Sequence, residues 1–135
     1  SVYGPNANQT NLITRLIIEA VTKSEMKHFG TGDEMRKYIF VNDVIKAAID
    51  SINKKYNKKK VIVIGNLAIS ISELMDQIIS LLGSDIKKIF ENNNYDIHYK
   101  SSPFDADLDG AIHFEINSPT NLNDGLKQTI GSILN

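Results

Sequence analysis

The stretch "FGTGDEMRKYIFVNDVIKA", residues 29–47, decides the fold because turn, strand and helix signals follow one another within it. Its glycine pair predicts a tight turn, since glycine adopts backbone conformations that other residues avoid. The segments "MKHF" before the turn and "RKYIF" after it predict two short extended pieces. "NDVIKAAIDSIN", residues 42–53, then predicts a helix capped by Asn42 or Asp43. This order of signals indicates a mixed α/β protein.

Apolar residues at helical spacing predict three further helices. The first covers about residues 9–23 and the last about residues 120–133. Between them, "SISELMDQIISLLG", residues 70–83, has a capping box of Ser70 and Glu73 and a terminating Gly83. About four helices are therefore expected. The helix in residues 42–53 carries these apolar residues on one face: Val44, Ile45, Ala48, Ile49 and Ile52.

The remaining extended segments are short. "VIVI", residues 61–64, has no polar alternation and predicts a strand buried on both faces of a parallel sheet. "IKKIF", residues 86–90, predicts a short helix. "YDIHYK", residues 95–100, and "AIHFEI", residues 111–116, alternate as strands do.

Composition excludes several classes of protein. The 135 residues suit one domain, with 41% hydrophobic and 23% charged residues, as in ordinary soluble globular proteins. A formal net charge of -1 gives no global attraction to nucleic acid or anionic membranes. The chain has no cysteine, which excludes disulfide and thiolate chemistry and fits a reducing cytosol. We therefore expect a cytoplasmic protein with neither a nucleic-acid nor a membrane partner.

One acidic stretch resembles a calcium-binding loop. In "DADLDGAIHFEI", residues 105–116, Asp105, Asp107 and Asp109 occupy loop positions 1, 3 and 5. The bidentate acid required at position 12 is absent, because Ile116 stands there and Glu115 comes one residue early. A solvated acidic turn is the default interpretation, and a small calcium-binding domain through residues 105–115 is an alternative.

Other catalytic and metal motifs are absent from the sequence. His28, His98 and His113 lack metal-ligand spacing, and no nucleophile-histidine-acid order or P-loop occurs. "FGTGDE" lacks the third glycine of a dinucleotide fingerprint, and the lysines of "KKYNKKK", residues 54–60, suit a solvated face. Arg36 is the exception. A planar guanidinium beside a glycine turn is well suited to bind a diphosphate bidentately.

Five segments in register resemble a known family. After the turn "SVYGPN", residues 1–6, and the first helix come residues 29–47, "VIVIGNLAISISELMDQI", residues 61–78, and "NLNDGLKQTI", residues 121–130. Together they resemble the carboxyl-terminal half of NAD-dependent nucleotide-sugar epimerases and dehydratases. These are extended short-chain dehydrogenase/reductase enzymes of the UDP-glucose 4-epimerase type. The resemblance is close over residues 1–83, weaker over 84–117, and returns in the last helix.

The resemblance implies a fragment of a Rossmann-type enzyme with its catalytic half missing. In this family the pyrophosphate loop and the catalytic Tyr-x-x-x-Lys pair precede the turn, and Tyr3 is not that tyrosine because residue 7 is alanine. Residues 1–135 are thus expected to be a single substrate-binding domain, truncated before Ser1. NAD or NADP would bind to the missing half, and the fragment would bind no cofactor and show no activity. Its expected partners are a nucleotide diphosphate sugar and the missing half.

The resemblance also implies roles for single residues. Arg36 would grip the diphosphate, and Asp43 would cap the following helix. The expected substrate-binding residues are Ser1, Tyr3, Phe29, Arg36 and Asn66, and the expected structural residues are Gly4, Pro5, Gly30, Gly32, Asp43 and Gly65. No catalytic residue and no metal ligand are expected, apart from the calcium alternative.

Three departures from the family pattern support a second alternative. The family often has asparagine at the positions of Ser1 and Val63, and a second phosphate-binding arginine in the region of residues 99–110, where this chain has none. A non-catalytic or assembly module that keeps the fold without the site would explain all three. A half-domain of this kind would also expose apolar edges, which predicts self-association, for example as a homodimer.

Overall fold

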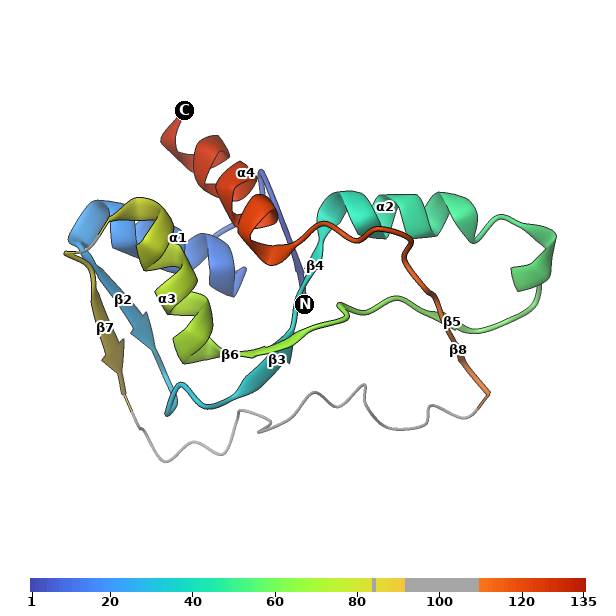
Figure 1. Ribbon diagram of the computed structural model, residues 1–135, viewed down its shortest axis with the longest axis horizontal. Coiled ribbons are helices and arrows are strands. Elements are labelled where there is room, and N and C mark those ends of the chain that lie inside the picture. Colours follow the sequence, from blue (N-terminus) through green and yellow to red (C-terminus); the bar gives the residue numbers. More distant parts are fainter. Residues whose placement is uncertain (84, 92–109) are drawn as a thin grey trace.

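The computed structural model describes residues 1–83, 85–91 and 110–135 (Figure 1). These residues form α-helices connected by short strands, with one short 3-10 helix, η1. The helices are α1 (Leu12–Lys23), α2 (Val41–Asp50), α3 (Ile71–Leu82) and α4 (Leu122–Leu134), and η1 covers Lys54–Tyr56. The mixed α/β class expected from the sequence is confirmed.

The described strands pair two by two. Three pairs are parallel: β1 (Val2–Tyr3) with β4 (Ile39–Phe40), β2 (Glu25–His28) with β7 (Lys87–Phe90), and β5 (Val61–Ile62) with β8 (Ile112–His113). β3 (Met35–Lys37) is antiparallel to β6 (Ala68–Ser70). The expected extended pieces on either side of the glycine turn are therefore present as β2 and β3–β4.

The hydrophobic core lies between three of the helices. α1, α3 and α4 contact one another, while α2 extends away from them (Figure 1). Leu16, Leu74 and Leu126, one from each of these helices, are fully buried. The rings of Tyr3 and Phe40 join this core, so the β1–β4 pair is anchored directly to the helices. None of the described helices is long and apolar enough to cross a lipid bilayer.

Helix ends follow local signals in α3. The Ser70 hydroxyl accepts from the Glu73 N–H at 3.1 Å, and the Glu73 carboxylate accepts from the Ser70 N–H at 2.9 Å. Gly83 ends the helix and donates its N–H to the carbonyl of Ile79. The predicted capping box and glycine stop are both confirmed.

The predicted cap of α2 is wrong. The chain enters α2 directly from β4, so Phe40 is the N-cap residue and no side chain caps the helix. Asp43 instead lies in the first turn of α2, buried, and faces the segment before α4. Its structural role is to hold two distant segments together, as described below.

The parallel strand predicted at residues 61–64 is present but shorter and less buried than expected, and the helix predicted at residues 86–90 is wrong. Residues 61–64 contribute only a two-residue strand, and their side chains are half-buried because β5 has β8 as its single described partner. "IKKIF" contains β7 instead of a helix, because its backbone pairs with β2 from Glu25 to His28. "AIHFEI" does contain a strand, β8, and "YDIHYK" lies outside the described residues. The last helix is confirmed as α4.

Candidate functional site

A cavity of about 350 Å³ contains three of the five predicted substrate-binding residues. It lies among β1, α1, the end of β2 and β3, and we call it the Arg36 pocket. Its lining residues are Ser1, Thr10, Asn11, Leu12, Arg15, His28, Phe29, Arg36, Tyr38 and Ile71. The structure thus brings Ser1, Phe29 and Arg36 together from separate parts of the chain.

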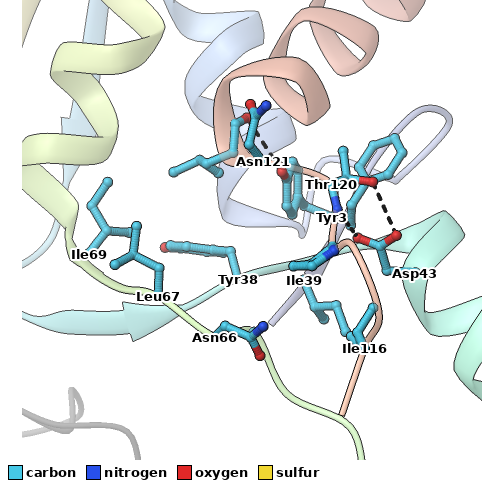
Figure 2. Close-up of a pocket in the computed structure, with 14 residues that line it drawn as sticks. Tyr3, Tyr38, Ile39, Asp43, Asn66, Leu67, Ile69, Ile116, Thr120 and Asn121 are labelled. Carbon is cyan, nitrogen blue, oxygen red and sulfur yellow. Dashed lines mark hydrogen bonds between the residues drawn. The ribbon is translucent and has the colours of Figure 1, made fainter.

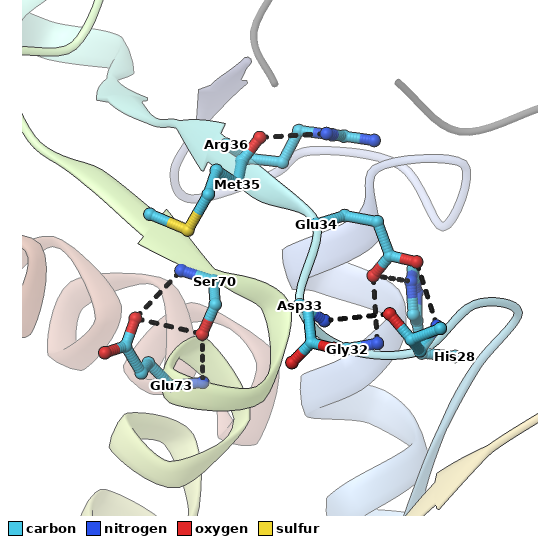
Figure 3. A network of polar contacts seen from close by, with 9 residues as sticks. His28, Gly32, Asp33, Glu34, Met35, Arg36, Ser70 and Glu73 are labelled. Carbon is cyan, nitrogen blue, oxygen red and sulfur yellow. Dashed lines mark hydrogen bonds and ion pairs between the residues drawn. The ribbon is translucent and has the colours of Figure 1, made fainter. Parts of the chain in front are cut away.

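Backbone pairing positions Arg36 and Ser1. Arg36 lies on β3 opposite Ile69 of β6, and its Nη1 donates to the Met35 carbonyl at 2.8 Å (Figure 3). Ser1 continues the β1–β4 pairing: its carbonyl accepts from the Ile39 N–H at 2.9 Å, and its nitrogen donates to the Lys37 carbonyl. Arg36 therefore lies on a strand, β3, that is held by its pairing with β6. The next strand, β4, is held by its pairing with β1.

The N–H groups of the glycine turn before Arg36 donate to a carboxylate of the same turn, that of Glu34. Glu34 is buried and accepts from the N–H groups of Thr31 and Gly32, each at 2.9 Å (Figure 3). Its other neighbour is His28, whose Nε2 lies 3.3 Å from the Glu34 carboxylate. Burial alone would raise the pKa of Glu34, but the backbone N–H donors and His28 together lower this pKa below its ordinary value.

This closure decides what the turn can bind. A glycine-rich loop holds a phosphate through free backbone N–H groups. Here the N–H groups of Thr31 and Gly32 already donate to Glu34. The turn therefore does not fit the pyrophosphate of NAD, and along the chain it lies between Phe29 and Arg36, which line the same cavity.

Several expected structural glycines have a steric reason. A side chain on Gly30, where φ is 155°, would overlap the Glu34 carboxylate and approach His28. At Gly65 a Cβ would overlap the carbonyl oxygen of Tyr38, because the two backbones are in direct contact. A Cβ would also overlap the Phe90 ring at Gly32 and the Val41 side chain at Gly4. Pro5, the remaining expected structural residue of the first turn, is half-buried.

The other two predicted binding residues, Tyr3 and Asn66, line a different cavity. This cavity of about 250 Å³ lies between β4, the segment around Asn66 and the segment before α4 (Figure 2). The Tyr3 ring is buried against Gly125 of α4, and burial, followed by the charges of Asp43 and Asp124, raises its pKa. Asn66 is exposed at this cavity.

Sequence reasoning did not assign Tyr38 or Arg15 to the Arg36 pocket, although both line it. Tyr38 lines both cavities, and burial, partly opposed by Arg36, raises the pKa of its hydroxyl to about 12. The signal for Tyr38 was available, since side chains two residues apart on a strand share a face and Arg36 is two residues away. Arg15 had no such signal, because only the packing of α1 beside β2 places it in the pocket.

The histidines and acids considered as metal ligands are not brought together within the described residues. His28 is buried beside Glu34, and His113 is exposed on β8. Asp105, Asp107 and Asp109, and also His98, lie outside the described residues. In the part of the chain that the structure describes, no three of the His, Cys, Asp and Glu side chains are arranged to hold a metal ion.

A model of the NAD dependent epimerase/dehydratase family matches residues 1–65. This segment includes Ser1, Phe29 and Arg36, and all but one of the lining residues of the Arg36 pocket. A search of curated proteins finds no match to the chain.

Solved structures with the same fold include epimerases and a dehydratase. The UDP-glucuronic acid 4-epimerase from Bacillus cereus, in complex with UDP-glucuronic acid and NAD, has a TM-score of 0.76 and 23% identity, covering 99% of this chain and 43% of that protein. Epimerase Mth375 from Methanothermobacter thermautotrophicus has a TM-score of 0.80 and 14% identity, covering 99% and 41%. The NAD-dependent NDP-hexosamine 5,6-dehydratase TunA, involved in tunicamycin biosynthesis, has a TM-score of 0.76 and 13% identity, covering 99% and 43%. The chain has the fold of part of these proteins and spans less than half of their length.

Proposed function

We propose that this chain is the nucleotide-sugar-binding portion of an NAD(P)-dependent sugar-nucleotide epimerase or dehydratase. The observation that carries the proposal is the convergence of Ser1, Phe29 and Arg36 on one cavity. Its volume of about 350 Å³ is within the range of small-molecule sites. The family-model match to residues 1–65 and the fold of the similar structures support the same function.

Each group of the pocket suits one part of a nucleotide sugar. The half-buried Arg36 guanidinium can bind two phosphate oxygens bidentately, which a lysine ammonium cannot do. The Phe29 ring is 48% exposed and offers an apolar face for a nucleobase. The Ser1 hydroxyl supplies a short polar group beside them. A ligand held in this way would be oriented at its diphosphate, leaving the sugar to be presented elsewhere.

We place the dinucleotide and the catalytic base outside residues 1–135. The glycine turn does not fit a pyrophosphate, because Glu34 accepts from its N–H groups. Within the parent enzyme, this portion would hold the nucleotide diphosphate so that the sugar ring faces the nicotinamide of NAD or NADP. Such positioning accounts for a large part of catalysis in two-substrate reactions. The isolated chain is accordingly expected to bind ligand weakly and to have no turnover.

Calorimetric titration of the isolated chain with UDP-glucose and GDP-mannose tests this function. Binding that Arg36→Ala abolishes supports it. Lys37→Ala is the matched control, since Lys37 is adjacent on β3 but lines a different cavity. An unmodified, folded chain that binds neither sugar nucleotide contradicts the proposal and favours a non-catalytic module with the same fold. Tight binding of NAD by the isolated chain contradicts the placement of the cofactor.

A further inference from the structure

We propose that Arg15 is a second diphosphate-binding residue of the Arg36 pocket. The inference rests on the proposed function, because it concerns the same ligand. The chain has two arginines among its fifteen Lys and Arg residues, Arg15 and Arg36, and both line this one cavity. They arrive there from different elements, α1 and β3, so local sequence does not bring them together.

The structure holds the Arg15 guanidinium in a defined place. Its Nη1 donates to the Glu19 carboxylate at 3.0 Å and to the carbonyl of Lys27 at 2.9 Å. The side chain is 31% exposed, so it is neither buried in the core nor loose in solvent. A guanidinium has five N–H donors, and these two contacts use those of Nη1. The donors on Nε and Nη2 have no hydrogen-bond partner among the described residues.

The surroundings of Arg15 favour an anion. None of the described residues that line the Arg36 pocket is acidic. Asn11 and Thr10 lie at the amino-terminal end of α1 on the same pocket and add neutral polar groups. Glu19 neutralises Arg15 in part, but it contacts only Nη1 of the guanidinium, its other oxygen accepts from the Lys27 N–H, and it is not itself a lining residue. The guanidinium groups of Arg15 and Arg36 thus line the same cavity.

The two positive charges of these guanidinium groups match the two negative charges of a nucleotide diphosphate sugar. Each of its two phosphates carries one negative charge, and one planar guanidinium can hold two phosphate oxygens. Arg36 alone would leave the second phosphate without a guanidinium partner among the described lining residues. With Arg15 the diphosphate is bound from α1 and from β3, which also fixes its orientation across the pocket.

The test compares four chains in calorimetric titrations with UDP-glucose and with uridine: unmodified, Arg15→Ala, Arg15→Lys and Glu19→Gln. Arg15→Ala should weaken UDP-glucose binding roughly 10- to 100-fold and leave uridine binding unchanged. Arg15→Lys should bind UDP-glucose with intermediate affinity, because lysine keeps the positive charge but cannot make the bidentate contact of a guanidinium. Glu19→Gln should bind UDP-glucose at least as well as the unmodified chain, because it removes the carboxylate that competes for Arg15.

A purely structural role for Arg15 gives a different result. Breaking the ion pair from either side would then weaken binding equally, so equal losses in Arg15→Ala and Glu19→Gln overturn the inference. Unchanged UDP-glucose binding in Arg15→Ala, with binding lost in Arg36→Ala, also overturns it and leaves the proposed function intact. No binding by the unmodified chain overturns both. If Arg15→Ala does not fold, the lysine variant decides: affinity equal to that of the unmodified chain contradicts a bidentate contact.

Discussion

The buried carboxylate of Asp43 accepts two hydrogen bonds from Thr120, a residue 77 positions further along the chain. The Thr120 N–H donates at 2.8 Å and its hydroxyl at 3.1 Å. Figure 2 marks both contacts with dashed lines. Thr120 directly precedes Asn121, the N-cap residue of α4. Asp43 therefore joins the first turn of α2 to the start of α4 and forms one side of the cavity that Tyr3 lines.

Replacing Asp43 by alanine should destabilise the fold substantially. The substitution removes both hydrogen bonds to a charged acceptor and leaves the Thr120 N–H without its partner, which costs about 1.5–3 kcal/mol. Urea denaturation followed by circular dichroism measures the loss. Asp50→Ala is the control, since Asp50 is exposed on the same helix and its substitution should change stability by less than about 0.5 kcal/mol. Equal effects of the two substitutions would argue against a role for the Asp43–Thr120 contact.

Gly65→Ala should destabilise the protein because of the close approach of two backbones. The added Cβ would overlap the Tyr38 carbonyl oxygen, and a backbone atom cannot move aside as a side chain can. Overpacking of this kind costs about 1–3 kcal/mol, which a lowered melting temperature would reveal. Gly131→Ala is the opposite case: it lies inside α4 with open space around it, and should stabilise the helix by about 0.5–1 kcal/mol. Gly65→Ala with an unchanged melting temperature would show that the two segments can separate.

What could be predicted from the sequence was mainly what neighbouring residues decide. The capping box of Ser70 and Glu73 and the stop at Gly83 act within one helical turn, and α3 was placed correctly from them. β7 could not be placed in this way. Its segment has no strong local preference, and pairing with β2, some sixty residues earlier, determines its conformation. Asp43 was misassigned as a cap for the same reason, since its partner is distant in sequence.

The same distinction between local signals and long-range contacts applies to the residues of the candidate site. Arg36 and Phe29 flank one turn, so sequence could place them together, and the cavity does contain both. Tyr3 was grouped with them because the family resemblance implies a role for it at the edge of the site. The Tyr3 ring instead packs against Gly125 of α4 and lines the second cavity. Arg15 belongs to the Arg36 pocket through tertiary packing alone.

The closed glycine turn predicts a specific dependence of stability on pH. Backbone donors lower the pKa of Glu34 in the folded protein below its ordinary value of 4.5. Because the folded-state pKa is depressed, the stabilisation is complete above the unfolded-state pKa and is lost as the pH falls through the folded-state pKa. The unmodified chain should therefore lose stability more steeply than Glu34→Gln as the pH falls below 4.5. Urea denaturation at neutral pH and at about pH 3 measures this difference.

Asp33→Asn is the control for the Glu34 experiment. Asp33 is adjacent and exposed, so the variant removes the same charge without removing the acceptor of the turn. Its pH profile should follow that of the unmodified chain. If Glu34→Gln also follows that profile, the hydrogen bonds to the carboxylate do not stabilise the turn.

The apolar face of α2 predicts how the isolated chain behaves in solution. An amphipathic helix normally turns such a face toward a core. Ile45 and Ile49 in α2, and Ile52 two residues beyond its end, are 51%, 62% and 82% exposed, and they recur at the spacing of one helix face. Contiguous exposed apolar surface of this kind favours association between molecules. We therefore expect the isolated chain to bind a hydrophobic dye and to self-associate at high concentration.

Ile49→Lys tests this expectation without disturbing the core. The substituted side chain is already in solvent, so the melting temperature should stay within about 2 °C while dye fluorescence and the mass measured by light scattering fall. Gln128→Lys adds the same charge at an exposed position of α4 and should alter neither measurement. A chain that remains monomeric at high concentration before any substitution contradicts the prediction. A large drop in the melting temperature of Ile49→Lys would instead mean that this face is covered within the molecule, which its exposed isoleucines argue against.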